Sequence, residues 1–498
     1  MSTTNLPGLG GHRHRDRDQD RRLGVILATC CLSLFVVGID ATIVNIALPS
    51  IQRSFHASVG GLQWTIDSYT VVIASLLMLA GSLADRFGRR RVFQIGLALF
   101  TLGSLLCSIA PGLGALVAFR MLQAVGGSML NPVALSIIAN TFTEPARRAR
   151  AMGVWASVVG ISFAVGPVLG GVLVGTVGWR AIFWVNVPVG LAAIWLTQRF
   201  VPESRAPRPR RLDPVAQILI MVLLAGVTAG TIEGPARGWT SPLIIGCYAA
   251  AAAAGVAVVL TELRRREPLI DPRFFGSAPF AGAALAALAA FAALAGFLFL
   301  NTIYLQSARG YSAITAGLLI LPMAATNVVT ARLSGRLVAA GQPRWALVIA
   351  GLAIAAGAGV LMTVSAATPI PELIVVYVVF GVGFGFVNPP ISNTAVSGMP
   401  AAQSGVAASI ASTCRQVGAT LGVAVTGLLV AGHEGSGFAA ASHAGWAVVC
   451  GCGLAVIGVG YASTSAWARR TAERTRELLI AEPEGDVTVH DRDSATAP

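Results

Sequence analysis

Fourteen long apolar segments divide this 498-residue chain, and each is about as long as the ~20 residues that an α-helix needs to cross hydrocarbon. Backbone N–H and C=O groups cannot stay unpaired in lipid, so segments of this length are predicted to be helices. The fold class is therefore predicted to be an all-α integral membrane protein with fourteen transmembrane helices. The predicted spans are 23–48, 62–82, 92–110, 113–138, 150–176, 180–199, 213–233, 241–261, 278–302, 313–335, 344–366, 370–396, 403–430 and 443–464.

The composition supports a membrane environment. Hydrophobic residues make up 55% of the chain and charged residues 11%, whereas a soluble domain carries roughly 25% charged residues. The formal charge is +13 and the chain has no Lys. The arginines lie between apolar segments and not on one amphipathic face, so we expect no nucleic-acid partner. Arg-only, Ala-rich and Gly-rich usage is typical of bacterial genomes rich in G and C.

The arginines also predict the orientation. They are dense in alternate loops, at 86–91, 147–150, 199–211 and 264–273, and in both tails. The outer loops carry only Arg53, Arg180, Arg237 and Arg309. Because cytoplasmic loops carry the excess of basic residues, we expect a multi-pass protein of the bacterial cell membrane with both termini in the cytoplasm.

Two halves of the chain are related by an internal repeat. FRMLQAVGGSMLNP at 119–132 aligns with YVVFGVGFGFVNPP at 377–390, which places Gly126 opposite Gly383 and Arg120 opposite Tyr377. Repeated halves are typical of transporters with a site between them. The expected domains are a polar tail (1–22), a six-helix bundle (23–199), a linker with two inserted helices (200–275), a second six-helix bundle (276–466) and a polar tail (467–498). Both tails are expected to be mobile.

Charged residues inside the spans are the main candidates for function, since each costs about 2.5–3.5 kcal/mol at the bilayer centre. Asp40 and Arg120 lie at a similar depth, about 12 Å and 10 Å from the outer face at 1.5 Å per residue, and Asp67 is close to it. A movable Arg–Asp contact can act as a proton switch. The alternative is a static structural ion pair.

Three further polar residues are possible substrate or coupling residues: Glu233, Arg415 and Asn388. For Glu233, a place at the membrane interface is the alternative. Arg415 has no acidic partner in its own half. Backbone carbonyls, Asn388 or an acid of the first half are all open as its partner.

The sequence gives no sign of a cofactor, a metal site or an enzyme. The seven Cys lie in apolar segments without a CxxC pair, no His lies in an apolar segment, and no GxxxxGK[ST] motif occurs. A proton gradient is therefore the expected source of energy.

Two longer motifs carry a family resemblance. GSLADRFGRRR runs from Gly81 to Arg91, with two glycines expected to turn the chain at the bilayer surface. GISFAVGPVLGG at 160–171 combines a small-xxx-small face with a proline that bends a helix. With IDATIVNIALP, R-x-x-Q-x-x-G-G and WRAIFWVNVPVG, these motifs resemble the fourteen-span drug:proton antiporters of the major facilitator superfamily, over residues from about 23 to 465.

The resemblance implies a function and roles for the motif residues. It implies efflux of small organic, amphipathic or cationic compounds in exchange for protons, with the two halves alternating around a cavity lined by spans one and four. In the first motif (Gly81, Asp85, Arg86, Gly88 and Arg89) it implies a gating loop, with Asp85 facing Gln403 and the arginines anchored to lipid. In the second (Gly160, Gly166, Pro167, Gly170 and Gly171) it implies an antiporter signature. A dedicated exporter of one metabolite or antibiotic is the alternative, and a membrane receptor is the candidate from another class. A monomer is expected.

Overall fold

The computed structural model describes residues 9–206, 213–265, 271–397, 399, 403–432 and 437–480. Within them, fourteen helical segments are long and apolar enough to cross a membrane, as predicted. The first half contains α1 (Leu9–Phe55), α2 (Val59–Phe87), α3 (Arg89–Ser108), α4 (Leu113–Thr141), α5 (Pro145–Thr176), α6 (Ala181–Trp184) and α7 (Asn186–Phe200). The sixth span is thus a short helix followed by a longer one.

The middle and second parts of the chain follow the same helical pattern. The inserted hairpin is α8 (Pro214–Arg237) and α9 (Pro242–Arg264). The second half contains η1 (Pro272–Gly276), α10 (Ala278–Ile303), η2 (Tyr304–Ala308), α11 (Ala313–Leu319), α12 (Leu321–Ala339), α13 (Pro343–Leu361), α14 (Ile370–Val396), α15 (Ser404–Val430), α16 (Phe438–Ser463) and α17 (Ala466–Ile480). We call α1–α7 the N-half and α10–α16 the C-half.

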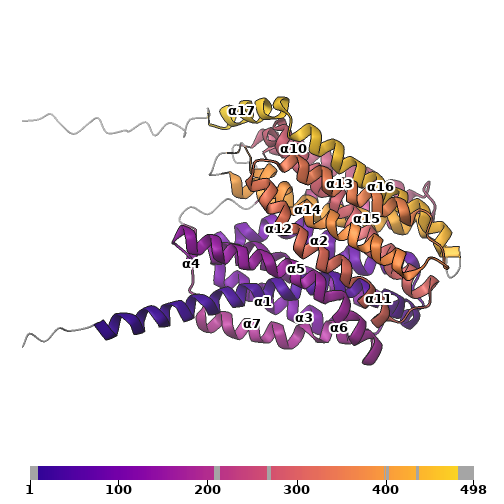
Figure 1. Ribbon diagram of the computed structural model, residues 1–498, viewed down its shortest axis with the longest axis horizontal. Coiled ribbons are helices and arrows are strands. Elements are labelled where there is room, and N and C mark those ends of the chain that lie inside the picture. The colour runs from indigo at the N-terminus through magenta and orange to yellow at the C-terminus, as the bar shows by residue number, and fades with distance from the viewer. Residues whose placement is uncertain are drawn as a thin grey trace, which may run out of the picture.

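The helices lie nearly parallel or antiparallel, with the N-half and the C-half side by side (Figure 1). The start of α1 and the helix α17 lie at one end of the molecule, which we call the terminal end. The opposite end, where α1 finishes and α11 begins, is the distal end. The loops with dense arginines lie at the terminal end, and the four isolated arginines lie in distal connections.

The two halves repeat the same glycine contacts. A Cβ added to Gly126 of α4 would meet the backbone of α3, and one added to Gly383 of α14 would meet the backbone of α13. On another pair of helices, Gly166 and Gly170 of α5 lie against α1, while Gly418 and Gly422 of α15 lie against α10. Small residues let helix backbones approach closely in membrane proteins. The aligned glycines therefore do the same packing in each half.

Two seams join the halves, and their chemistry differs. In one, α5 packs on α11 through Gly171, whose added Cβ would meet the backbone of Ala313 and Ile314. In the other, α2 packs on α15 through polar groups: the Gln63 amide donates to the carbonyl oxygens of Val423 (3.1 Å) and Ala424 (2.8 Å). The inserted helix α8 packs on both α2 and α15. It therefore covers the polar seam.

Both tail regions are more ordered than expected. Helix α1 begins at Leu9, well before the first apolar residues, because extending a formed helix costs little compared with starting one. At the other end, α17 is helical and packs on η1 and α10. The backbone N–H of Ala278 donates to the hydroxyl of Thr471 at 2.9 Å, and Leu479 belongs to an apolar cluster with Phe274 and Phe280. Residues 481–498 lie outside the described part.

Candidate functional site

Asp40 of α1 and Arg120 of α4 form an ion pair inside the N-half, as their common depth predicts. The Nη1 of Arg120 donates to Oδ2 of Asp40 at 2.5 Å, and its Nε donates to the carbonyl oxygen of Thr65 on α2 at 3.3 Å. Asp40 is 0% exposed and Arg120 is 1% exposed. A pair this deeply buried depends on further hydrogen bonds to offset the cost of removing both charges from water.

Three neutral side chains supply those hydrogen bonds. Gln123 accepts from Arg120 at 2.7 Å and donates to Oδ1 of Asp40 at 2.8 Å. Asn186 of α7 also donates to this oxygen, at 3.0 Å, and the hydroxyl of Ser104 on α3 accepts from both amides. Asp40 thus accepts three hydrogen bonds from side chains. The sequence reasoning assigned no role to Gln123, Asn186 or Ser104, although Gln123 follows Arg120 at helical i+3 spacing and so shares its face.

Aromatic rings complete the enclosure. The guanidinium carbon of Arg120 lies 4.0 Å from the ring centre of Tyr69 and 5.7 Å from that of Phe183. The contributing helices α1, α2, α3, α4, α6 and α7 all belong to the N-half. The pair was expected to face the cavity between the halves. Instead it points into the N-half bundle, where α3 and α7 offer the polar partners that two buried charges require.

The C-half holds a buried neutral pair that includes the repeat equivalent of Arg120. The hydroxyl of Tyr377 on α14 donates to Oδ1 of Asn301 on α10 at 2.6 Å, and both residues are 0% exposed. Tyr377 is the repeat equivalent of Arg120. Asn301 lies on α10, which packs on α15 as α1 packs on α5. The repeat equivalent of Arg120 thus makes a hydrogen bond without charge. Its partner is not the repeat equivalent of Asp40, because the aligned glycines Gly170 and Gly422 contact Ile43 and Ala292, which places Asp40 opposite Ala289.

Asp67 of α2 is the buried acid with the fewest partners in the described N-half. It is 0% exposed, the hydroxyl of Thr70 donates to its Oδ1 at 3.4 Å, and its Oδ2 has no hydrogen-bond partner among the described residues. Its neighbours Gln63 and Thr70 face α15, and Thr70 contacts Thr420 there at 2.9 Å. Asp67 therefore lies at the seam between the halves, apart from the Asp40–Arg120 pair.

Among the described residues, Arg415 of α15 contacts none of the three partners considered from the sequence. Its Nη2 donates to the hydroxyl of Ser412 at 2.6 Å, and its guanidinium carbon lies 6.0 Å from the ring centre of Phe291. Its Nη1 is buried and has no hydrogen-bond partner in the described chain. Asn388 is an exposed residue of α14, so the structure does not bring it to Arg415. A serine at i−3 on the same helix is the nearer partner.

Glu233 lies in the last turn of α8, at the distal end. The Nε1 of Trp64 on α2 donates to Oε1 of Glu233 at 2.9 Å, and the Nε of Arg237 donates to Oε2 at 2.8 Å. The Glu233 side chain is 29% exposed and that of Arg237 is 57% exposed. Glu233 thus sits at the boundary between the protein surface and the α2–α8 contact.

The expected gating loop is held mainly within its own half. Asp85 pairs with Arg89 at 2.8 Å, and no contact of Asp85 with Gln403 is present among the described residues. The turn is made by Gly88 alone, at φ = 111°, because α2 continues through Gly81 to Phe87. The expected turn at Gly81 was therefore wrong. That Asp85 faces the N-terminus of the thirteenth span, near Gln403, stays a prediction. An acid at i and an arginine at i+4 pair locally in preference to a distant helix end.

A linker segment closes over this loop. The backbone N–H of Arg89 donates to the carbonyl oxygen of Ser204 at 2.9 Å, and that of Ala206 donates to the carbonyl oxygen of Asp85 at 3.1 Å. Glu203 accepts from the backbone N–H of Arg90 at 3.2 Å. Arg86 lies over the ring of its neighbour Phe87, 5.8 Å from the ring centre. The sequence reasoning did not foresee the part played by 203–206.

The residues of the second motif serve two interfaces. Gly166 and Gly170 contact α1 within the N-half, whereas Gly171 contacts α11 of the C-half. The carbonyl oxygen of Pro167 lies where a Cβ added to Gly317 of α11 would be. A Cβ added to Gly160 would lie 3.4 Å from Val328 of α12. The motif thus joins one face of α5 to its own bundle and the other face to the opposite half.

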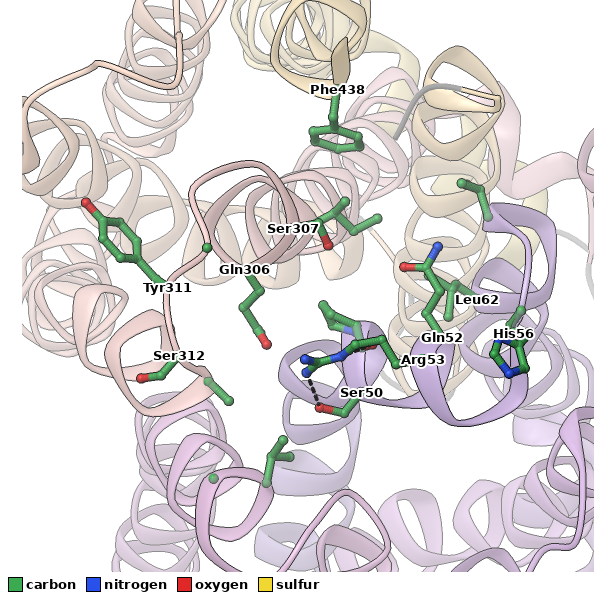
Figure 2. Close-up of a pocket in the computed structure, with 18 residues that line it drawn as sticks. Ser50, Gln52, Arg53, His56, Leu62, Gln306, Ser307, Tyr311, Ser312 and Phe438 are labelled. Atoms are coloured by element: carbon green, nitrogen blue, oxygen red, sulfur yellow. Dashed lines mark hydrogen bonds between the residues drawn. The ribbon is translucent and has the colours of Figure 1, made fainter. Parts of the chain in front are cut away.

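A vestibule of about 900 Å³ opens at the distal end between the halves (Figure 2). The N-half contributes Arg53 and His56 at the end of α1, and the C-half contributes Gln306, Ser307 and Tyr311. Arg53 donates to Ser50 at 3.3 Å, and the amide of Gln306 donates to the carbonyl oxygen of Ile46 across the interface at 2.9 Å. The described residues that line this vestibule include no Asp or Glu. It is therefore polar with a positive bias.

The chain belongs to the Major Facilitator Superfamily, whose sequence profile matches residues 30–423. It is 38% identical over 401 residues to the multidrug resistance protein Stp of Mycobacterium tuberculosis, covering 80% of this chain and 74% of the relative. It is 36% identical to the tetracenomycin C resistance and export protein of Streptomyces glaucescens, covering 83% and 77%. It is 34% identical to the multidrug efflux pump LfrA of Mycolicibacterium smegmatis, covering 82% and 81%.

Solved structures agree on the fold. A D-xylose–proton symporter superposes with a TM-score of 0.62 at 15% identity, covering 87% of this chain and 96% of the symporter. An inward-facing bacterial homologue of the lysosomal transporter Spinster gives a TM-score of 0.61 at 18% identity, covering 91% and 98%. The chain is thus a transporter of this superfamily, related to drug and antibiotic efflux pumps, and not an enzyme.

Proposed function

We propose that this protein exports small amphipathic organic compounds from a bacterial cell in exchange for protons. The observation that carries the proposal is Asp67, a fully buried acid that lies at the seam between the halves and has one oxygen without a partner. A charge held there without a counter-ion costs about 2.5–3.5 kcal/mol, and a bound proton removes that cost. Protonation of Asp67 therefore changes the free energy of the contact between the halves. In this way the binding of a proton is linked to the motion of the halves.

The Asp40–Arg120 pair is the second element of coupling. Protonation of Asp40 would weaken its bond to Arg120 and leave the arginine to Gln123 and the carbonyl of Thr65. The Nε contact with Thr65 connects this event to α2, the helix that carries Asp67. Asp67 therefore lies on α2, and Asp40 of α1 is linked to the same helix through Arg120. Helix α2 packs on the C-half through α15.

The path of the substrate runs between the halves and out through the distal vestibule. We place the terminal end in the cytoplasm, because the basic loops gather there. A potential of about 100 mV supplies about 2.3 kcal/mol for each proton that enters, enough for more than a tenfold concentration ratio. Release of the substrate requires that α5 and α11 move apart at the distal end. Their contact is made through glycines, so no interlocked bulky side chains oppose this movement.

The relatives support this reading and also an alternative. Two carry the names of multidrug proteins, and one is named for resistance to and export of tetracenomycin C. The relative named for tetracenomycin C favours the alternative, a dedicated exporter of a single antibiotic. A panel of growth-inhibition measurements on cells lacking and overproducing the protein separates a broad profile from protection against one compound.

The test of the proposal is proton release coupled to transport. In vesicles with a pH gradient, a compound identified by the growth panel should be concentrated against its gradient, and adding it should release protons. Asp67→Asn should insert in the membrane and fail to concentrate the compound. Coupled exchange by both Asp67→Asn and Asp40→Asn at the level of the unmodified protein would overturn the proposal.

The orientation has its own test. Single cysteines replace Ser204 at the terminal end and Ser307 in the vestibule, in a background without the native cysteines. An impermeant thiol reagent should label position 307 and spare position 204 in intact cells. The reverse pattern would invert the topology.

A further inference from the structure

The inserted hairpin lies directly over the unpartnered acid. Helix α8 runs antiparallel along α2 and contacts it at two levels: Glu233 accepts from Trp64 at the distal level, and Gln217 donates to the carbonyl oxygen of Ser75 nearer the terminal end. Asp67 lies between these levels, three residues from Trp64, which is about 4.5 Å along the helix axis. Glu233 is therefore bonded to α2 within one helical turn of Asp67.

The rotation of α2 places Asp67 toward α8 and α15. At 100° per residue, Asp67 lies on the strip between Gln63 and Thr70, which contact α15, and Trp64, which contacts Glu233 of α8. Leu62, which lines the vestibule, lies 140° away from Asp67 by the same count. The α2–α8 contact is thus on a different side of α2 from the vestibule.

Polar groups continue along this contact. Ser68 is 2% exposed, and its hydroxyl has no hydrogen-bond partner in the described chain. On α8, Thr228 is 2% exposed and Thr231 is 8% exposed. The hydroxyl of Thr231 donates to the carbonyl oxygen of Val227 at 2.8 Å and lies 3.2 Å from that of Tyr248. The hydroxyl of Thr231 thus faces α9. The buried hydroxyls left at the α2–α8 contact are those of Ser68 and Thr228, and such groups can hold water between Glu233 and Asp67.

The charges around Asp67 leave Glu233 as the acid that connects it to the surface. From α4, Arg120 donates to the carbonyl of Thr65 and is paired with Asp40 of α1. From α15, Arg415 lies five residues before Thr420, toward the terminal end. From α8, Glu233 has one face toward Trp64 and the other toward solvent and Arg237.

We propose that Glu233 collects protons at the distal face and passes them to Asp67 along the α2–α8 contact, apart from the route of the substrate. The inserted hairpin then has a function: it insulates a proton path from lipid and from the vestibule. This inference rests on the proposed proton-coupled function. A proton moves from the carboxyl of Glu233 through ordered water to Oδ2 of Asp67, and Glu233 regains a proton from the distal solution.

The experiment follows the protonation of Asp67 without any substrate. The purified full-length protein is subjected to a rapid drop in pH, and the infrared carbonyl band of a protonated carboxyl is recorded. Asp67→Asn identifies the band that belongs to Asp67. In Glu233→Gln we expect this band to rise about tenfold more slowly. This is less than the roughly 10²–10⁴-fold that a positioned acid–base group contributes, because water still reaches the site. Its final height should not change.

Matched variants separate a relay from a structural role. Glu372→Gln makes the same change at an exposed acid of α14 at the distal end and should leave the rate unchanged. Arg237→Gln removes the cation beside Glu233 and should also keep the rate. Added imidazole, a small proton carrier, should restore the rate in Glu233→Gln.

Four outcomes would overturn the inference: an unchanged rate in Glu233→Gln, an equal slowing in Glu372→Gln, a slow rate that imidazole does not restore, or no band assignable to Asp67. The proposed function fails in a different way. If the unmodified protein shows normal Asp67 kinetics but no proton release on transport, the relay stands and proton-coupled export does not.

Discussion

The two halves of this transporter share their helix contacts through glycine but differ in the polar pairs that they bury. In the N-half, Asp40 and Arg120 form a buried ion pair with amide partners. In the C-half, Asn301 and Tyr377 form a buried hydrogen bond without charge. The helix contacts through glycine are repeated in the two halves, whereas the buried charge is not, because Tyr377 stands where the N-half has Arg120. Under the proposed function, proton coupling therefore belongs to the N-half.

The largest effect is expected from breaking the charged pair. Asp40→Asn leaves Arg120 buried without its counter-charge, and removal of one partner of a buried pair costs about 3–5 kcal/mol. We expect a lower unfolding temperature in detergent and loss of concentrative transport in vesicles.

A double variant replaces the charged pair of the N-half by the residue types of the neutral pair in the C-half. Asp40→Asn with Arg120→Tyr should recover much of the lost stability, because no unpaired charge remains, yet it should not restore coupled transport. Coupled exchange by this double variant would show that the charge at this place is structural and that the halves do not differ in function.

The reverse substitution introduces a charge into the neutral pair of the C-half. Asn301→Asp places an acid opposite a tyrosine hydroxyl, with no cation hydrogen-bonded to either residue in the described chain. A charge inside a span costs about 2.5–3.5 kcal/mol. The yield in the membrane and the unfolding temperature should fall, and adding Tyr377→Arg should restore part of both. Asn393→Asp, at an exposed position near the end of α14, is the matched control and should be neutral. An unaffected Asn301→Asp protein would mean that the C-half tolerates charge as the N-half does.

The sequence predicted the parts of this comparison that depend on length and depth. The fourteen spans follow from apolar length, and the Asp40–Arg120 contact follows from two charges at one depth. The partners Ser104 and Asn186 could not be predicted, because they depend on how α3 and α7 rotate against α1. The inward direction of the pair was missed for the same reason. Asp85 shows another limit, because its local i+4 partner Arg89 was not considered from the sequence.

The contact between the halves gives a smaller effect. Gly171→Ala adds a methyl group against the backbone of Ala313, and overpacking of this kind costs about 1–3 kcal/mol. The cost falls on the state with the distal seam closed, so that seam should open more often. A thiol reagent should label a cysteine at Ser307 about tenfold faster, as expected for a shift of about 1.4 kcal/mol.

The control lies in the same helix. Gly153→Ala adds the same methyl group where no atom lies within 4 Å, so labelling and transport should not change. Equal labelling in the two variants would mean that the α5–α11 contact does not control the distal opening, and that the glycines of the second motif serve packing alone.

The smallest effect is expected where the neutral pair is removed as a whole. Tyr377→Phe alone leaves the Oδ1 of Asn301 buried without its donor, and an unsatisfied buried group costs about 1–3 kcal/mol. Tyr377→Phe with Asn301→Leu removes both partners and replaces them by apolar groups of similar shape, which can be nearly neutral. The double variant should therefore unfold at nearly the same temperature as the unmodified protein and should keep coupled transport. The corresponding loss of both charges in the N-half should abolish coupling while stability recovers. If the double variant of the C-half also uncouples protons from transport, the neutral pair takes part in the cycle and the proposed division between the halves is wrong.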